Sequence, residues 1–137
     1  MKPAYTFYPN ACRVGTFKEI KHLKGRAAKE GVVMDEKTSY HVFEVAGQIV
    51  GFVGSMSLNS DSSVMRFKSD WVDPDWRKQG IYKILFDIRD KSIKPNVCEV
   101  NAFCTQLSLP MYKSRGFEVV TVNGRGSTFV KKEIITK

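Results

Sequence analysis

The stretch from residue 64 to residue 103 restricts the possible folds of this chain more than any other part of its sequence. It reads VMRFKSDWVDPDWRKQGIYKILFDIRDKSIKPNVCEVNAF and changes its pattern twice. Val64–Asp73 is typical of a strand, the residues from Gly80 to Pro95 place apolar side chains on one helical face, and Asn96–Phe103 is again typical of a strand. Strand–helix–strand connections are right-handed, so the two strands are expected to lie parallel and near each other. The segment therefore predicts a mixed α/β sheet with helices on its faces.

The rest of the chain adds further helices and strands. Thr16 and Glu19 have the spacing of a capping box, so Thr16–Gly31 predicts a helix, or two short helices because Gly25 lies within it. The remaining predicted elements are strands at Tyr40–Val45 and Ile49–Leu58, a short helix in Thr105–Phe117 that closes near Gly116, and a final hairpin with Asn123-Gly124 at its turn. The expected order is helix, three strands, helix, strand, helix and two strands.

Length and composition fit an ordinary globular protein. The 137 residues are 42% hydrophobic and 26% charged, which predicts a single domain over residues 1–137. No apolar run approaches the roughly 20 residues that span a bilayer, and the N-terminus has no apolar core of a secretory signal, so we expect a cytoplasmic location. Three cysteines without a C-x-x-C pair and two histidines argue against a disulfide framework and against a metal site.

The charge balance favours anionic partners. Twenty-two Lys and Arg residues against 14 Asp and Glu residues give a net charge of +8. A surplus of this kind suits a phosphorylated cofactor, an acidic substrate or nucleic acid. A basic surface that has no dedicated partner explains the same surplus, and composition does not separate the two readings.

The turn between the strand and the helix carries the clearest chemical signal. Arg77, Lys78 and Gly80 stand immediately before the predicted helix, and Lys83 lies in its first turn. The first N–H groups of a helix point outward without an internal partner and attract anions, and glycine lets an anion come close. The sequence has neither a G-x-x-x-x-G-K-[ST] loop nor a G-x-G-x-x-G loop. The physical reading is therefore an anion site at Arg77–Tyr82, against the simpler alternative of a loop with ordinary surface charges.

Two motifs resemble those of the GNAT superfamily, the acyl-coenzyme A-dependent N-acyltransferases. "VDPDWRKQGIYKIL" is similar to the family's V-x-P-x-[YW]-R signature followed by its pyrophosphate turn, with Tyr82 where Gly or Ala is usual. "LPMYKSRGFEVV" resembles the family's A-x-x-L-Y-x-x-x-G-F, with Met111 for Leu. The resemblance covers about Ser39 to Ile134. It implies a mixed, mostly antiparallel sheet with a central parallel strand pair and helices on both faces.

The resemblance also implies a function and a set of site residues. An acyl group, in the first instance acetyl, moves from acyl-coenzyme A to an amine by direct attack. The catalytic acid that protonates the departing thiolate is Tyr112, whose hydroxyl is protonated at neutral pH. The implied cofactor-binding residues lie on the strand, the turn and the later helix: Trp71, Val72, Arg77, Lys78, Gln79, Gly80, Ile81, Tyr82, Lys83, Thr105 and Ser108.

Three positions depart from the family pattern. Thr105 replaces a frequent Asn and Ser108 replaces Ala, and Tyr82 places a bulky ring where close packing is usual. The resemblance therefore predicts a narrowed or tilted cofactor channel at Tyr82.

The general base is the least defined part of the predicted site. Asp70, on the strand before the turn, is the first candidate by position, and Asp73 and Glu99 follow. His41 could contribute from the hairpin. Cys104 is expected near the cofactor, but no base that would activate it can be identified.

Other functions remain open on the sequence alone. One alternative is a nucleic-acid-directed protein of the same fold that modifies or binds DNA; another is a protein that binds the cofactor without turnover. The basic and aromatic residues that would contact nucleic acid are Lys18, Lys21, Lys24, Arg26, Tyr5, Phe7 and Tyr8. The acceptor is either a small amine or a protein amine, no membrane partner is expected, and the sequence decides neither the acceptor nor between a monomer and a dimer.

Overall fold

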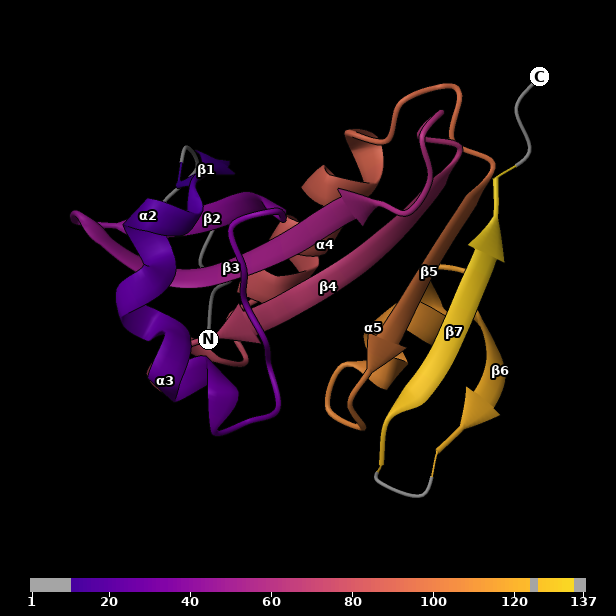
Figure 1. Cartoon of the computed structure of the whole chain (residues 1–137). Coiled ribbons are helices and arrows are strands. Elements are labelled where there is room, and N and C mark those ends of the chain that lie inside the picture. Colours follow the sequence, from indigo (N-terminus) through magenta and orange to yellow (C-terminus); the bar gives the residue numbers. More distant parts are fainter. Residues whose placement is uncertain (1–10, 124–125, 135–137) are drawn as a thin grey trace. The chain divides into compact units, whose positions relative to one another are not determined.

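The computed structural model describes residues 11–123 and 126–134, and the chain separates into two compact units. The first unit comprises the chain up to Gly54 together with Ser69–Ser92, and the second comprises Ser55–Lys68 together with the chain from Ile93 onward. Strands β3 (Gln48–Ser57) and β4 (Val64–Val72) contribute residues to both units. Figure 1 labels these strands.

The described strands form one hydrogen-bonded series in the order β1-β2-β3-β4-β5-β7-β6. The other bounds are β1 (Cys12–Gly15), β2 (Ser39–Val45), β5 (Glu99–Cys104), β6 (Glu118–Val122) and β7 (Thr128–Glu133). Strand β4 pairs with β5 in parallel, from Val64↔Glu99 to Phe67↔Ala102. The pairs β1–β2, β5–β7 and β6–β7 are antiparallel. The predicted mixed, mostly antiparallel sheet with a central parallel pair is therefore confirmed.

The helices are short except for one. They are α2 (Phe17–Ile20), the 3₁₀ turn η1 (Lys21–Leu23), α3 (Lys24–Ala28), the 3₁₀ turn η2 (Pro74–Trp76), α4 (Ile81–Lys91) and α5 (Leu109–Ser114). The Glu19 carboxylate accepts a hydrogen bond from the Thr16 N–H at 2.9 Å, as the capping-box spacing predicts. Pro110 lies in the first turn of α5, where it costs no helical hydrogen bond. None of the described helices is long and apolar enough to cross a membrane.

The first unit has apolar cores on both faces of its strands. On one face, Ile20, Leu23 and Ala27 of the N-terminal helical segment pack with a set of strand residues. On the other face, Ile81 and Leu85 of α4 pack against a second set. The strand residues are Tyr40, Val42, Ile49, Phe52 and Trp71 in the first core and Phe43, Val45, Val50, Val53 and Val72 in the second. Helices therefore cover both faces of these strands.

The second unit has a smaller aromatic core under α5. The ring of Phe117 lies 5.0 Å from the ring of Tyr112 and 6.1 Å from that of Phe67, measured between centroids. All three residues are buried. Val100, Ala102 and Val130, from paired strands, are fully buried as well. The packing of α5 on its strands therefore fixes the position of Tyr112.

Some details differ from the sequence prediction. Strand β1 was not expected; it pairs with β2 from Cys12↔Phe43 to Gly15↔Tyr40. Asp73 caps the turn η2, because its side chain accepts the Asp75 N–H at 3.0 Å. The final hairpin is present as β6 and β7, although Gly124 of its predicted turn lies outside the described residues.

Candidate active site

The loop that precedes α4 has a backbone shape suited to surrounding an anion. Lys78 has φ = +65° and Gly80 has φ = +82°, so two residues of this short loop are left-handed. Gly80 is the N-cap of α4, and its carbonyl accepts the Ile84 N–H at 3.1 Å. The first turn of α4 contains no acidic residue. A loop with left-handed residues that leads into a helix N-terminus turns backbone N–H groups toward one point.

Arg77 is held by contacts within the first unit. Its Nε donates to the Val72 carbonyl at 2.9 Å, and a terminal nitrogen donates to Glu30 at 2.5 Å. The Glu30 carboxylate also accepts the indole N–H of Trp71 at 2.8 Å. Burial raises the pKa of Glu30, but the hydrogen bonds from Arg77 and Trp71 lower it by more. The pKa of Glu30 therefore lies below its usual value. Arg77 therefore fastens the loop before α4 to the turn that follows α3, while Lys78 and Lys83 are exposed.

Arg26 strengthens the same corner of the first unit. It forms an ion pair with the buried Asp73 at 3.1 Å, and its guanidinium lies 5.3 Å from the centroid of the Trp71 ring. Arg26, one of the predicted nucleic-acid contacts, therefore has partners within the protein. Lys18, Lys21 and Lys24 are exposed, whereas Tyr5, Phe7 and Tyr8 lie outside the described residues.

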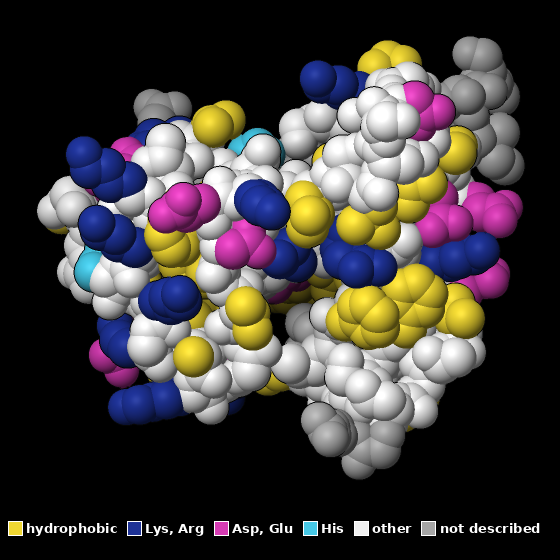
Figure 2. Space-filling model, in the orientation of Figure 1, with side chains coloured by type: hydrophobic (Ala, Val, Ile, Leu, Met, Phe, Trp, Pro, Cys, Tyr) yellow, Lys and Arg dark blue, Asp and Glu magenta, His cyan; other side chains and the backbone are white. Residues whose placement is uncertain are grey.

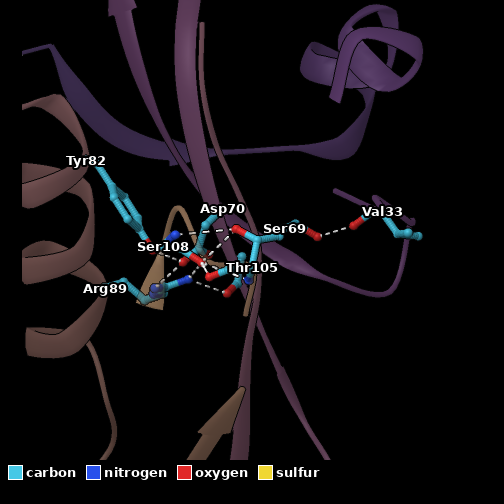
Figure 3. Close-up of polar contacts among 8 residues, drawn as sticks. Val33, Ser69, Asp70, Tyr82, Arg89, Thr105 and Ser108 are labelled. Carbon is cyan, nitrogen blue, oxygen red and sulfur yellow. Dashed lines mark hydrogen bonds and ion pairs between the residues drawn. The ribbon is translucent and has the colours of Figure 1, made fainter. Parts of the chain in front are cut away.

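Asp70 takes part in a buried ion pair with α4 (Figure 3). The two terminal nitrogens of Arg89 donate to its two carboxylate oxygens at 2.5 and 3.1 Å. The Tyr82 hydroxyl donates to the same carboxylate, and Arg89 also donates to the Gly54 carbonyl at 3.0 Å. Side-chain exposure is 1% for Arg89 and 9% for Asp70. The role of Asp70 as a general base stays a prediction. In the structure, its ion pair with Arg89 anchors α4 to β4.

The Tyr82 ring extends along α4. It packs edge-on against Phe86, one turn further along the helix, at 5.9 Å between centroids. Its hydroxyl is directed to Asp70 on β4 (Figure 3). These contacts place the ring beside α4, on the side of the helix that faces β4. The expected narrowing of a cofactor channel by this ring stays a prediction.

Strand β4 is irregular at Ser69. This residue has φ = +59°, a left-handed conformation that is rare inside a strand and is typical of a β-bulge. Its hydroxyl donates to the Val33 carbonyl at 2.5 Å, on the side opposite Asp70 (Figure 3). Further along the strand, the Asp73 N–H donates to Val50 of β3. Because hydrogen-bonding direction alternates along a strand, the Trp71 backbone faces β3 and the Val72 backbone faces away from it.

Thr105 and Ser108 join β5 to α5 in the second unit. The Thr105 N–H donates to the Ser108 hydroxyl at 3.2 Å, and the two hydroxyls lie 3.3 Å apart. The Thr105 carbonyl accepts the Leu109 N–H at 3.0 Å. Both side chains therefore close the turn before α5, and their predicted contact with the cofactor stays a prediction. Tyr112 follows on α5 and is 2% exposed.

The other candidate bases have structural partners too. Glu99 accepts a hydrogen bond from the Asn101 amide at 2.8 Å and lies 3.7 Å from the Lys131 ammonium. Asp73 is buried in its contact with Arg26. His41 is half-buried on β2, and its pKa is lowered by burial and by the charge of Arg89. Among the described residues, no cluster of three or more His, Cys, Asp or Glu could hold a metal ion.

Sequence reasoning missed two residues that organise the site. Arg89 was not singled out, yet it follows Leu85 by four residues on the buried side of α4. A basic residue on an otherwise apolar helical stripe, next to a strand with an acid, is the signal that could have revealed the pair. Glu30 gave no such signal, because 47 residues separate it from Arg77.

Comparisons with known proteins identify the family. Residues 8–134 match the model of the acetyltransferase (GNAT) domain. No curated protein matches the chain.

Among solved structures, PaiA N-acetyltransferase from Thermoplasma acidophilum, in complex with coenzyme A, is 12% identical, with a TM-score of 0.69 over 90% of this chain and 98% of that one. The acetyltransferase of the GNAT family from Streptococcus pneumoniae is 12% identical, with a TM-score of 0.71 over 90% of this chain and 98% of that one. N-acetylglutamate synthase from Neisseria gonorrhoeae, complexed with coenzyme A and N-acetyl-glutamate, is 12% identical, with a TM-score of 0.69 over 89% of this chain. The matched part is only 35% of the length of that protein.

At these identities the structural matches establish the fold, and the domain match establishes the family. PaiA N-acetyltransferase and N-acetylglutamate synthase are each bound to coenzyme A in these structures. The domain match confirms the predicted resemblance and, with it, the predicted acyl-coenzyme A cofactor. The chain belongs to the GNAT acetyltransferase family, whose members use acyl-coenzyme A.

Proposed function

We propose that this protein is an N-acyltransferase that transfers an acetyl group from acetyl-coenzyme A to an amine by direct attack. The observation that carries the proposal is the loop before α4, with Lys78 and Gly80 both left-handed and no acid in the first helical turn. Membership of the GNAT family supports the same reaction class.

The chain offers a binding surface for the diphosphate of the cofactor. The backbone N–H groups from Lys78 to Tyr82 form the cradle, and the exposed ammonium groups of Lys78 and Lys83 supply positive charge. Arg77 acts as a positioning residue, because its guanidinium is already bound to Glu30 and Val72. The donor set therefore fits a diphosphate.

The edge of β4 suits the pantetheine arm. An extended chain adds to a sheet edge through backbone hydrogen bonds. The Val72 N–H faces away from β3 and is the donor that we assign to this contact, while the Val72 carbonyl already receives Arg77. Trp71 contributes through its side chain, which bonds to Glu30 and stacks under Arg26.

Bound acyl-coenzyme A supplies an activated acyl group as a thioester. In the balanced reaction, a bond forms between the amine nitrogen and the acyl carbon, and the bond from that carbon to sulfur breaks. The amine loses one proton, and the departing sulfur gains one. We assign the second proton to the Tyr112 hydroxyl, which packing under α5 holds in place. Asp70 remains the proposed acceptor of the first proton by its position on β4, directly or through water.

The test measures cofactor binding and turnover separately. Acetyl-coenzyme A is expected to raise the melting temperature of the wild type, and Gly80→Glu is expected to abolish the shift, because a side chain with a negative charge enters a left-handed position of the cradle. Gly25→Glu is the matched control, since that glycine is exposed on α3, where an added Cβ meets open space. Tyr112→Phe should keep the shift and lower the release of thiol about 10²- to 10⁴-fold. An unchanged melting curve of the wild type at saturating acetyl-coenzyme A would contradict the proposal.

A further inference from the structure

The strands of the second unit have one face packed under α5 and one face turned away from it. On the packed face, the ring of Tyr112 contacts that of Phe117, which in turn contacts Phe67. Side chains alternate along a strand, so the residues between the buried ones belong to the other face. Strand pairing places nine residues there, and we call them the open face: Arg66 of β4, Glu99, Asn101 and Phe103 of β5, Phe129, Lys131 and Glu133 of β7, and Glu118 and Thr121 of β6.

The centre of the open face is apolar and exposed. Phe103 is 57% exposed, although β5 is paired on both sides and large apolar residues of this kind are usually buried. Its ring packs on that of Phe129 at 4.8 Å between centroids, and the Arg66 guanidinium lies 4.8 Å from the Phe103 centroid. Figure 2 shows hydrophobic side chains gathered over β5 and β7, with basic and acidic side chains beside them. An apolar centre with a polar rim is the composition of a protein–protein interface.

The rim contains a row of four residues that crosses the open face. Strand pairing sets Arg66 beside Asn101 and Asn101 beside Lys131. Lys131 stands in turn beside Glu118. Arg66 Nε donates to the buried Asn101 at 3.0 Å, which holds the guanidinium in place. Among the described residues, neither Arg66 at one end of the row nor Glu118 at the other forms an ion pair, so the row ends in a cation on β4 and an anion on β6.

We propose that the open face binds a second copy of the chain about a twofold axis that runs parallel to the strands, between β5 and β7. Such an axis lays β5 of one copy over β7 of the other, and β4 over β6. Phe103 then packs on Phe129 of the partner subunit, and Arg66 meets Glu118 of the partner subunit. Because the axis repeats each contact, both ends of the row gain a partner of opposite charge.

The remaining charges fit this arrangement and argue against a nucleic acid. The Lys131 ammonium lies 3.7 Å from Glu99 and 3.9 Å from Glu133. The axis brings Glu99 near Glu133 of the partner subunit, and the Lys131 of each copy offsets that repulsion. Glu118 is a third carboxylate on the same face, which has only two cations, so phosphate groups would be repelled. A second copy supplies the opposite charge at each end of the row, and a polyanion does not.

The size of the open face predicts a weak dimer. Four strands about 4.8 Å apart and about five residues long cover roughly 19 by 17 Å. Side chains that stand up from this plane increase the accessible area, but it stays near or below the roughly 800 Å² per partner of a standard interface. Interfaces at this end of the range are often transient, so the dissociation constant is expected at roughly 10–500 µM.

Sedimentation equilibrium of the full chain, from about 10 µM to about 1 mM, measures this association. The wild type is expected to pass from monomer to dimer over that range. Arg66→Glu and Glu118→Arg should each raise the dissociation constant about tenfold or more, because each sets like charges against each other at both ends of the row. Arg66→Glu combined with Glu118→Arg exchanges the charges and should return the constant to within about threefold of the wild-type value.

Two further variants separate the open face from the rest of the surface. Lys113→Glu is the matched control, because it makes the same change in net charge as Arg66→Glu at an exposed position of α5, on the packed face. Its dissociation constant should stay within about twofold of the wild-type value. Phe103→Asp places a charge at the apolar centre and should abolish the dimer. Circular dichroism and the urea midpoint check that each variant is folded.

The outcomes decide this inference separately from the proposed function. A wild type that stays monomeric at about 1 mM would overturn it, as would two single charge reversals that the double variant does not rescue. Binding of a fluorescein-labelled oligo(dT) that is lost in Phe103→Asp would show that a nucleic acid occupies the open face, and this also overturns the inference. A monomer whose melting temperature still rises with acetyl-coenzyme A would leave the proposed acyl transfer supported.

Discussion

Arg77, just before α4, and Arg89, in its last turn, have the same kinds of partner in different surroundings. Each binds one carboxylate and one backbone carbonyl: Glu30 and Val72 for Arg77, Asp70 and Gly54 for Arg89. Side-chain exposure is 30% and 32% in the Arg77–Glu30 pair, but 1% and 9% in the Arg89–Asp70 pair. Water can replace a lost partner far more readily at the first pair than at the second.

This difference assigns the two pairs different tasks. A buried pair that loses one member leaves an uncompensated charge in a medium of low dielectric, so it fixes α4 on its strand. A half-exposed pair contributes little to stability but still orients what it holds. What the Arg77–Glu30 pair holds is the turn that we propose as the diphosphate cradle. The comparison therefore predicts that stability depends on Arg89 and cofactor binding on Arg77.

The largest expected effect comes from breaking the buried pair. Arg89→Met leaves Asp70 without its guanidinium and is expected to lower the free energy of unfolding by about 3–5 kcal/mol. Arg77→Met, the matched change at the exposed pair, is expected to cost about 1 kcal/mol or less. Urea denaturation measures both values.

A second variant shows whether charge or volume is responsible for that loss. Asp70→Leu combined with Arg89→Met removes both charges, and apolar replacement of a buried pair is often neutral, so stability should recover most of the loss. If the double variant is as unstable as Arg89→Met, lost packing accounts for the effect, and the assigned role of the buried pair is wrong.

The contrast between the pairs also marks how far sequence alone could reach. The elements from β4 to β5 were predictable, because apolar periodicity, Pro74 and Gly80 are local signals, each contained within a few residues of the sequence. The turn and α5 were likewise found by their motifs. The carboxylate partners of the two arginines could not be predicted in this way, because Glu30 is 47 residues from Arg77 in the sequence and Asp70 is 19 residues from Arg89.

Strand β1 was missed for the same physical reason. It has four residues, and its one large aliphatic side chain, Val14, is 71% exposed. Nothing in so short a stretch shows the alternation of a half-buried strand. It is a strand because it pairs with β2, and pairing between distant segments leaves no local pattern.

An intermediate effect is expected from Glu30→Gln, which keeps the side-chain shape and removes the charge that holds Arg77. Stability should fall by about 1 kcal/mol or less, since the pair is half-exposed. The dissociation constant for coenzyme A should rise about two- to tenfold, because a loosened turn must be ordered on binding. Asp75→Asn, which removes a charge from the same turn without a contact to Arg77, is the control; equal effects of both variants would mean that overall charge, and not the tether, governs affinity.

Acid provides an independent check on the same pair. The pKa of Glu30 is lower in the folded protein than its ordinary value of 4.5, so its contribution to stability is present above that value and is lost as the pH falls through the folded pKa. The stability difference between wild type and Glu30→Gln should therefore close in acid. A difference that stays constant from pH 7 to pH 3 would show that the carboxylate charge is not what stabilises this corner.

The smallest expected effect reports how far the charge of Arg89 extends. In the folded protein, burial lowers the pKa of His41 below its ordinary value of 6.5, and the Arg89 charge lowers it further. Because the folded pKa is the lower one, neutral His41 adds stability above pH 6.5 that is lost as the pH falls through the folded pKa. In the Asp70→Leu/Arg89→Met variant, the NMR-titrated pKa of His41 should rise but stay below 6.5, since burial remains. An unchanged pKa would confine the influence of Arg89 to its direct partners, and a full return to 6.5 would mean that burial of His41 contributes nothing.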